Sequence, residues 1–163
     1  MIKDKKWNKN SKEKVKKKRG TCMEQQYYKH LVQYYETDQM KIVHHSNYIR
    51  WFEEARSWYL EQAGFGYDKM EETGVISPVL EVQCRYKSMV RYGEEVYIIP
   101  HLVKFNGIKM VVEYEIKDVK TGELRATGQS SHGFLNREYK PISLKKENPE
   151  IYQVFFNLLE EKK

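Results

Sequence analysis

A helical segment with an unusual number of aromatic residues constrains the fold of this chain most. Across residues 47–63, apolar side chains recur at spacings of three and four, which predicts an α-helix. They are Tyr48, Trp51, Phe52, Ala55, Trp58, Tyr59 and Ala63. Ser46 suits the N-cap of this helix and Gly64 suits its end. So many rings on one helix predict that other elements cover it on several sides.

Strand-like segments precede and follow this helix. Residues 27–35 are rich in Tyr, Leu and Val, and four longer runs rich in Val, Ile, Tyr and Phe cover residues 79–89, 94–105, 109–119 and 123–136. Short turns join the four runs, and Asn106-Gly107 is typical of a type I′ hairpin. A short helix is predicted near residues 67–72 and a final one over residues 149–161.

The order strand, helix and four antiparallel strands predicts the architecture. One aromatic helix inserted after the first strand requires a curved sheet that wraps around it. This arrangement is the hotdog fold, an α+β class with an antiparallel sheet, a central aromatic-rich helix and, here, a C-terminal helix. A single such layer leaves a sheet edge or face open, so we expect a homodimer or homotetramer.

Charge is distributed very unevenly along the 163 residues. The first 22 residues hold ten Lys or Arg against two acidic residues, so their net charge is +8 and the remainder of the chain carries −2. We expect residues 1–24 to be a disordered basic tail without a specific function, before one hotdog domain over residues 25–163. Alternatives are that Met23 is the true start, or that the tail is an arm that binds RNA or anionic lipid. The near-neutral domain argues against nucleic acid as its partner.

Several other classes of protein are disfavoured. Cys22 and Cys84 form no CxxC pair, which predicts a reduced, cytoplasmic protein. The sequence contains no run of eighteen apolar residues, so no membrane span is predicted. No apolar segment follows the basic N-terminus, so no secretory signal is predicted either. The five histidines lack zinc-ligand spacing and no phosphate-binding glycine motif is present, so we expect no metal and no nucleotide.

Two candidate catalytic residues flank the loop before the aromatic helix. Asp38 ends the first predicted strand, where it could act as a general base or a nucleophile, although a turn aspartate that bonds its own backbone is the alternative. His45 lies seven residues later in the first turn of the helix. Its backbone N–H has no intrahelical partner and could bind a carbonyl oxygen, and its imidazole could move a proton. A space-filling histidine is the alternative.

Polar residues inside the predicted helix are further candidates. Asn47 and Tyr48 could donate hydrogen bonds to a substrate, or could simply cap and pack. Glu53 is either a second carboxylate near the site or, as the favoured interpretation, a buried partner for Arg56.

The pattern around Asp38 resembles the motif of the 4-hydroxybenzoyl-CoA thioesterase family, the hotdog-fold acyl-CoA thioesterases. The matching residues are Thr37-Asp38, Met40, Val43, His45, Asn47-Tyr48, Phe52-Glu53 and Ala55-Arg56, and weaker matches are Cys84-Arg85-Tyr86, Arg91-Tyr92-Gly93-Glu94, Gly122-Glu123 and Thr127-Gly128. The resemblance covers residues 27–141. Lys41 stands where the family usually has glycine, and His44 where it often has tyrosine. A side chain at Lys41 is unfavourable if that position needs a positive φ.

The resemblance implies an enzyme that hydrolyses an acyl-CoA thioester to a carboxylic acid and free CoA. Asp38 would be the catalytic carboxylate, and the backbone amide of His45 would polarise the thioester carbonyl. CoA would bind across a subunit interface with its phosphates near Lys87, Arg91, Lys104 or Lys109. No cofactor is expected, because coenzyme A is part of the substrate. An acyl carrier protein thioesterase and a non-catalytic acyl-CoA-binding module are the alternatives.

Overall fold

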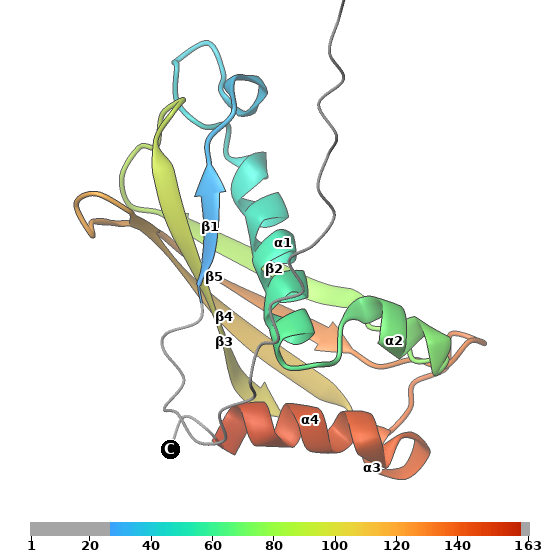
Figure 1. Ribbon diagram of the computed structural model, residues 1–163. Coiled ribbons are helices and arrows are strands. Elements are labelled where there is room, and N and C mark those ends of the chain that lie inside the picture. Colours follow the sequence, from blue (N-terminus) through green and yellow to red (C-terminus); the bar gives the residue numbers. More distant parts are fainter. Residues whose placement is uncertain (1–26, 161–163) are drawn as a thin grey trace, which may run out of the picture.

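The computed structural model describes residues 27–160 of the chain. The predicted basic tail of residues 1–24, with Met23, lies outside the described residues. Figure 1 shows a curved sheet with one long helix, α1, lying against one of its faces. The elements in chain order are β1 (Tyr28–Leu31), η1 (Tyr34–Glu36), α1 (Ser46–Gln62), α2 (Tyr67–Glu72), β2 (Val79–Tyr86), β3 (Glu95–Phe105), β4 (Lys109–Asp118), β5 (Leu124–Gly133), α3 (Leu144–Glu147) and α4 (Pro149–Glu160).

The five strands form one antiparallel sheet in the order β1-β3-β4-β5-β2. Tight turns join β3 to β4 and β4 to β5, whereas β1 and β2 lie at opposite edges with α1 between them in sequence. The predicted α+β hotdog architecture is therefore confirmed. Because β2 is an edge strand, one row of its backbone groups has no partner strand within the described residues.

The aromatic helix is buried along the face that meets the sheet, whereas Arg50, Glu53 and Glu54 are exposed, so the prediction that other elements cover it on several sides is wrong for one protomer. Trp51, Phe52 and Ala55 are at most 1% exposed, and the ring of Phe52 stacks on Tyr114 of β4 at 4.4 Å between centroids. Gly64 ends the helix with φ +84°, and its N–H donates to the carbonyl of Glu61 at 2.9 Å. The predicted end of the helix is thus confirmed as a left-handed C-terminal cap. At the start, His45 rather than Ser46 is the N-cap.

Three local predictions need correction. The first strand ends at Leu31, and residues 34–36 form a 3₁₀ turn, because the carboxylate of Glu36 accepts the N–H of Gln33 at 2.7 Å and turns the chain off the sheet edge. The β3–β4 hairpin is not type I′, since Gly107 has a positive φ but Asn106 does not. The short helix α3 was absent from the prediction.

The C-terminal helix closes the end of the sheet that lies away from the loop between η1 and α1 (Figure 1). Phe155 of α4 packs on Phe105 and Phe134 at ring-centroid distances of 5.2 and 5.6 Å. This cluster extends the core beyond α1. Within residues 27–160, no helix is long and apolar enough to cross a membrane.

Candidate active site

Asp38 lies in a tight loop that folds back on itself between η1 and α1. An isolated β-bridge pairs Thr37 with Val43, and Asp38 N donates to the carbonyl of Ile42 at 3.0 Å. Lys41 N donates to the carbonyl of Asp38 at 2.9 Å, and Lys41 adopts φ +60°. The position occupied by Lys41 therefore does need the left-handed conformation that glycine adopts most easily.

The carboxylate of Asp38 is half-buried and only partly engaged. Its Oδ1 atom accepts the N–H of Met40 at 2.8 Å, which is the turn-type bond expected of an aspartate at this kind of position. No described residue donates a hydrogen bond to its Oδ2 atom, and no described cation pairs with it. Asp38 is therefore held in place by the backbone while one oxygen remains available.

A cavity of about 480 Å³ opens beside Asp38. One wall is the Asp38 loop with the start of α1, and the other is the end of β2 with the residues that follow it. The lining residues are Asp38, Met40, Ile42, Val43, His45, Tyr48, Tyr86, Lys87, Ser88 and Met89. Apart from the carboxylate, the lysine and a few polar atoms, this lining is apolar, so the cavity suits an apolar group attached to a polar reacting centre.

The first turn of α1 faces this cavity at His45. Within the described residues no protein group accepts a hydrogen bond from the backbone N–H of His45, whereas its carbonyl accepts the phenol of Tyr86 at 3.0 Å. The neighbouring His44 bonds Ser46 Oγ through Nδ1 at 2.8 Å. A free N–H at a helix start carries partial positive charge and can stabilise an oxyanion.

Two tyrosines of the cavity stay protonated over the physiological pH range. Burial, followed by the neighbouring Cys84 and Tyr86, raises the pKa of Tyr48 to about 12. Burial and Cys84 likewise raise the pKa of Tyr86 to about 12. Their rings meet edge to face at 4.9 Å. Both phenols therefore act as neutral groups, and Tyr86 uses its proton to hold the start of α1.

Some of the predicted site residues line the cavity beside Asp38 and others do not. Asp38, His45, Tyr48 and Lys87 line one cavity. Asn47 does not line it, because its buried amide donates to the carbonyl of Glu36 at 2.8 Å.

The predicted pairing of Glu53 with Arg56 is wrong. Glu53 is exposed, and Arg56 donates instead to the phenols of Tyr67 at 2.6 Å and Tyr114 at 3.2 Å. The helix turns Glu53 to solvent while it turns Arg56 into the core.

Two predicted phosphate ligands lie apart from the cavity lining. Arg91 is exposed on the segment after β2, with its guanidinium near Met89 Sδ at 4.0 Å. Lys109 begins β4 at the end of the sheet that α3 and α4 cover, far along the strand from the Asp38 loop (Figure 1). Within one protomer, Lys109 therefore cannot share a site with Asp38.

Sequence reasoning identified Lys87 but not the other residues that form the cavity wall at the end of β2. Tyr86 ends β2, and Ser88 and Met89 follow it; no local pattern links Ser88 or Met89 to Asp38. Glu36 was also missed as a buried carboxylate next to the site. It is not among the residues that match the family motif, which begin at Thr37, so the sequence offered no signal for it.

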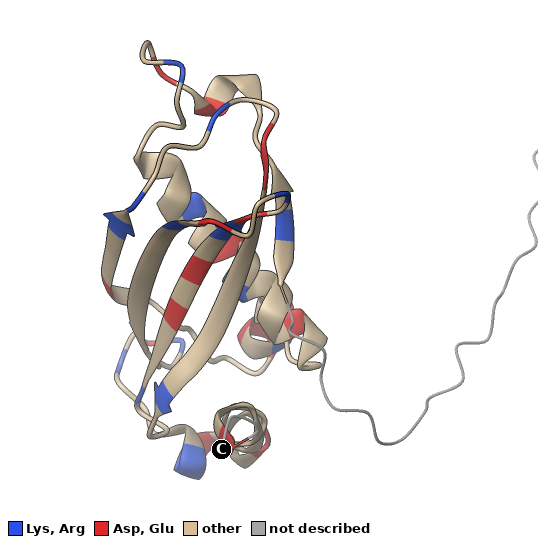
Figure 2. Ribbon diagram, turned by 90° about the vertical axis from the view of Figure 1, so that its left-hand side faces the viewer, with Lys and Arg blue, Asp and Glu red and all other residues tan. Residues whose placement is uncertain are grey.

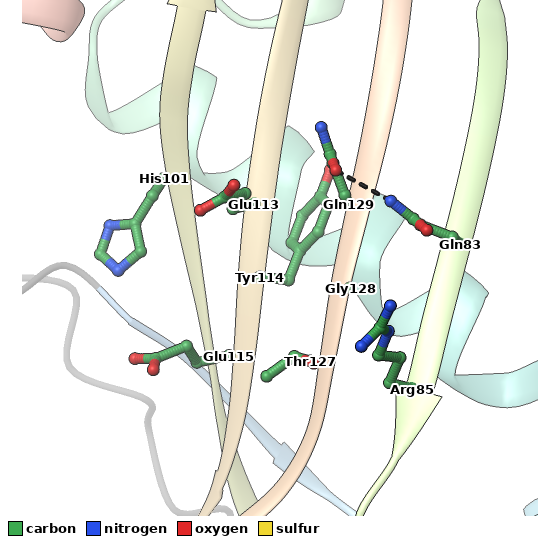
Figure 3. Close-up of a pocket in the computed structure, with 9 residues that line it drawn as sticks. All are labelled: Gln83, Arg85, His101, Glu113, Tyr114, Glu115, Thr127, Gly128 and Gln129. Carbon is green, nitrogen blue, oxygen red and sulfur yellow. Dashed lines mark hydrogen bonds between the residues drawn. The ribbon is translucent and has the colours of Figure 1, made fainter.

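A second hollow of about 560 Å³ lies on the sheet face that points away from α1. Figure 3 shows side chains from β2 to β5 around it, among them Arg85, Glu113 and Gln129. Figure 2 shows acidic residues along the middle of this sheet. The hollow is open and polar and has no helix terminus beside it. In the described part of the chain, no cluster of three or more His, Cys, Asp or Glu could hold a metal ion.

Comparisons with known proteins agree with this geometry. Residues 32–155 match the family model described as the thioesterase-like superfamily. A Bacillus subtilis (strain 168) protein with the provisional name acyl-CoA thioesterase YneP is 38% identical over 125 residues, which cover 76% of this chain and 90% of that protein. The crystal structure of a DHNA-CoA thioesterase from Staphylococcus aureus is similar with a TM-score of 0.79 and 32% identity, covering 83% of this chain and 91% of that one. A hypothetical protein from Thermus thermophilus gives 0.75 and 30%, covering 81% and 98%.

Proposed function

Since this chain belongs to the thioesterase-like superfamily and is a hotdog-fold acyl-CoA thioesterase, we propose that Asp38 carries its chemistry. The reaction converts an acyl-CoA and water to a carboxylic acid and free CoA. The observation that carries the proposal is the position of Asp38. Its half-buried carboxylate has a free oxygen and opens on a largely apolar cavity beside the start of α1.

Asp38 acts on the thioester carbonyl by one of two routes. As a general base, its free Oδ2 takes a proton from water while the water oxygen bonds to the carbonyl carbon. As a nucleophile, Oδ2 bonds to that carbon directly, and water later cleaves the resulting anhydride. In both routes the carbonyl π electrons move to oxygen, then return as the C–S bond breaks. The CoA sulfur leaves as a thiolate, which then takes up a proton.

The backbone N–H of His45 stabilises the oxyanion in this mechanism. It has no described protein acceptor, and it lies at the positive end of a 17-residue helix. Removing one donor of this kind lowers turnover by roughly 10²–10³ in other hydrolases. Because a thiolate is a good leaving group, the reaction needs no metal ion and no cofactor beyond the CoA of the substrate.

The apolar cavity lining receives the acyl group, and the phosphates of CoA lie outside it. Lys87 at the rim and Arg91 beyond it are exposed cations on the same segment, so both are placed to meet a phosphate. Lys109 could reach the same CoA only from another subunit.

A second copy of the chain completes the site by pairing along β2. This edge strand exposes Leu80 and Tyr86 by 52% and 49%, more apolar surface than an isolated edge strand usually leaves in water. Tyr86 and Lys87 at its end also line the cavity beside Asp38. Val82→Lys places a charge on this strand, and we expect it to lower the molar mass measured by light scattering to that of a monomer. An unchanged mass contradicts pairing along β2.

Replacement of Asp38 tests the proposed chemistry. Thiol release is measured for Asp38→Asn over short, long and aromatic acyl-CoAs, and over acyl carrier protein thioesters of equal acyl length. Asp68→Asn is the matched control, because Asp68 is an exposed aspartate in the first turn of α2. We expect Asp38→Asn to lower kcat by roughly 10²–10⁴ and the control to keep it.

Two outcomes contradict the proposal. If Asp38→Asn turns over every acyl group near the wild-type rate, Asp38 is not the catalytic carboxylate. If the wild-type protein retains acyl-CoA tightly and releases no thiol from any of them, it is a binding module.

A further inference from the structure

Glu36 is the most heavily bonded buried carboxylate near the site, although it does not line the cavity. It is 4% exposed. Its Oε1 accepts the indole N–H of Trp51 at 2.7 Å, and its Oε2 accepts the backbone N–H of Gln33 at 2.7 Å. His30 Nε2 lies 3.1 and 2.9 Å from the two oxygens. One side chain therefore ties β1, η1 and the second turn of α1 together.

The backbone of Glu36 adds a second set of bonds to the start of α1. Its carbonyl oxygen accepts the N–H of His44 at 2.8 Å and the side-chain amide of Asn47 at 2.8 Å. Residues 37–43, which include Asp38, lie between these two points of attachment. Glu36 thus holds both ends of the loop that separates the carboxylate from the helix start.

The hydrogen bonds to Glu36 favour its ionised form. Burial alone would raise its pKa, but the hydrogen bonds from Gln33, His30 and Trp51 outweigh burial and hold the pKa below its usual range. The group is therefore an anion at neutral pH, which strengthens each of these bonds. An amide in its place would offer one acceptor oxygen instead of two and would present an N–H₂ to at least one donor.

We propose that Glu36 is a positioning residue, which holds the Asp38 carboxylate at the correct distance from the first turn of α1. The proposal rests on the proposed function of Asp38. It assigns no contact with substrate to Glu36. Its effect falls on the alignment of the attacking oxygen with the carbonyl carbon and oxyanion donor, and thus on kcat more than on KM. Misplacement by about 1 Å can lower a rate by about 10²-fold.

The test compares Glu36→Gln, Asp38→Asn and the double variant. We expect Glu36→Gln to lower kcat by roughly 10- to 100-fold with KM within about threefold of wild type. In the Asp38→Asn background, the same change should lower the residual rate by less than about threefold, because the aligned group is gone. Glu71→Gln is the control, since Glu71 is exposed on α2. All variants are assayed below their unfolding temperatures.

A second variant covers the case in which Glu36→Gln does not fold. Trp51→Phe keeps an aromatic ring in the core but removes the N–H that bonds Glu36 Oε1. Trp58→Phe on the same helix is its control, because Trp58 is half-buried and makes no described hydrogen bond to Glu36. We expect a severalfold loss of kcat in Trp51→Phe that Trp58→Phe does not show.

The outcomes separate this proposal from the one on which it rests. Wild-type kcat in Glu36→Gln, or an equal loss with and without Asp38, overturns the positioning role and leaves the assignment of Asp38 intact. If Glu36→Gln is unfolded, equal kcat in Trp51→Phe and Trp58→Phe overturns it. Wild-type turnover in Asp38→Asn overturns the assignment of Asp38 itself.

Discussion

The backbone N–H of Val43 donates to the carbonyl of Val90 at 2.8 Å. Val43 closes the loop that carries Asp38, and Val90 follows the segment that forms the opposite wall of the cavity. Both residues are buried, so this bond is shielded from water. Arg125 supports the second wall by donating to the carbonyl of Met89 at 3.0 Å and to Asp118 at 2.8 Å. These bonds do not involve the side chains that line the cavity. Substitution of a lining side chain should therefore leave the distance between the two walls unchanged.

Lys41→Gly is expected to stabilise the protein. Lys41 has φ +60°, a conformation that costs a residue with a Cβ about 1–2 kcal/mol. Glycine removes this strain but loses more entropy on folding, so the net gain should be about 0.5–1 kcal/mol in the free energy of unfolding. Urea denaturation measures it. Lys41→Ala also removes the ammonium group but keeps the strain, and equal stability of the two variants would refute the explanation.

Gly128→Ala should destabilise the fold, because α1 packs directly on this position. A Cβ at Gly128 would overlap the ring of Phe52. The ring cannot move freely, since it is 1% exposed and stacked on Tyr114. We expect a loss of about 1–3 kcal/mol in the free energy of unfolding. Gly133→Ala on the same strand is the control, because its Cβ would meet only Leu80 side-chain atoms at 3.6 Å or beyond. A similar loss in both variants contradicts this explanation.

Stability should fall between pH 7 and pH 5 because of His132. This residue is fully buried, and burial, followed by the charge of Arg56, lowers its pKa to about 3. In the unfolded chain its pKa is about 6.5, so below that pH the unfolded state binds a proton that the folded state excludes. The stability contributed by neutral His132 is therefore complete above pH 6.5 and is lost progressively as the pH falls towards 3.

The measurement compares the free energy of unfolding of wild type and His132→Gln at pH 7 and pH 5. From linkage, wild type should lose about 2 kcal/mol more than the variant over this interval. Exposed His44 provides the control, since His44→Gln should keep the wild-type dependence. The same pH dependence in His132→Gln as in wild type would show that His132 is not its source.

Removal of divalent metal ions should leave thioester hydrolysis unchanged. Asp38 and the start of α1 supply the base and the oxyanion donor, and the thiolate leaves without Lewis-acid assistance. The protein is treated with EDTA, passed into metal-free buffer and assayed for thiol release with and without added Zn²⁺, Mg²⁺ or Mn²⁺. A loss of activity on chelation that one of these ions restores would assign the chemistry to a metal site instead.

Some features of the site follow from local sequence. The three- and four-residue spacing of rings specifies α1, and Gly64 ends it, because helix period and capping depend on neighbours within a few residues. The resemblance around Asp38 also points to the loop that lines the cavity. Its departure at Lys41 identifies a residue with positive φ, which is a property of one position and its immediate neighbours.

Features that depend on contacts between distant segments could not be predicted. Arg56 bonds two phenols rather than Glu53, because the packing of α1 against β4 and α2 decides which face of the helix is buried. Lys109 lies at the end of the sheet away from the Asp38 loop of its own protomer, because strand direction and register, rather than proximity to a turn, determine where a residue lies.

The long helix, the strands, their order along the chain and the aspartate that precedes the helix could all be predicted from local patterns of residues. Periodicity and turn chemistry act over a few residues, so they can be read directly. The presence of Tyr86 and Met89 in the cavity beside Asp38, and the burial of Glu36, depend instead on the tertiary structure. The strand order β1-β3-β4-β5-β2 places β1 and β2 at opposite edges of the sheet. The Asp38 loop and the start of α1 meet the end of β2 only through contacts such as the bond from Tyr86 to the carbonyl of His45, and no local property of the chain encodes such partners.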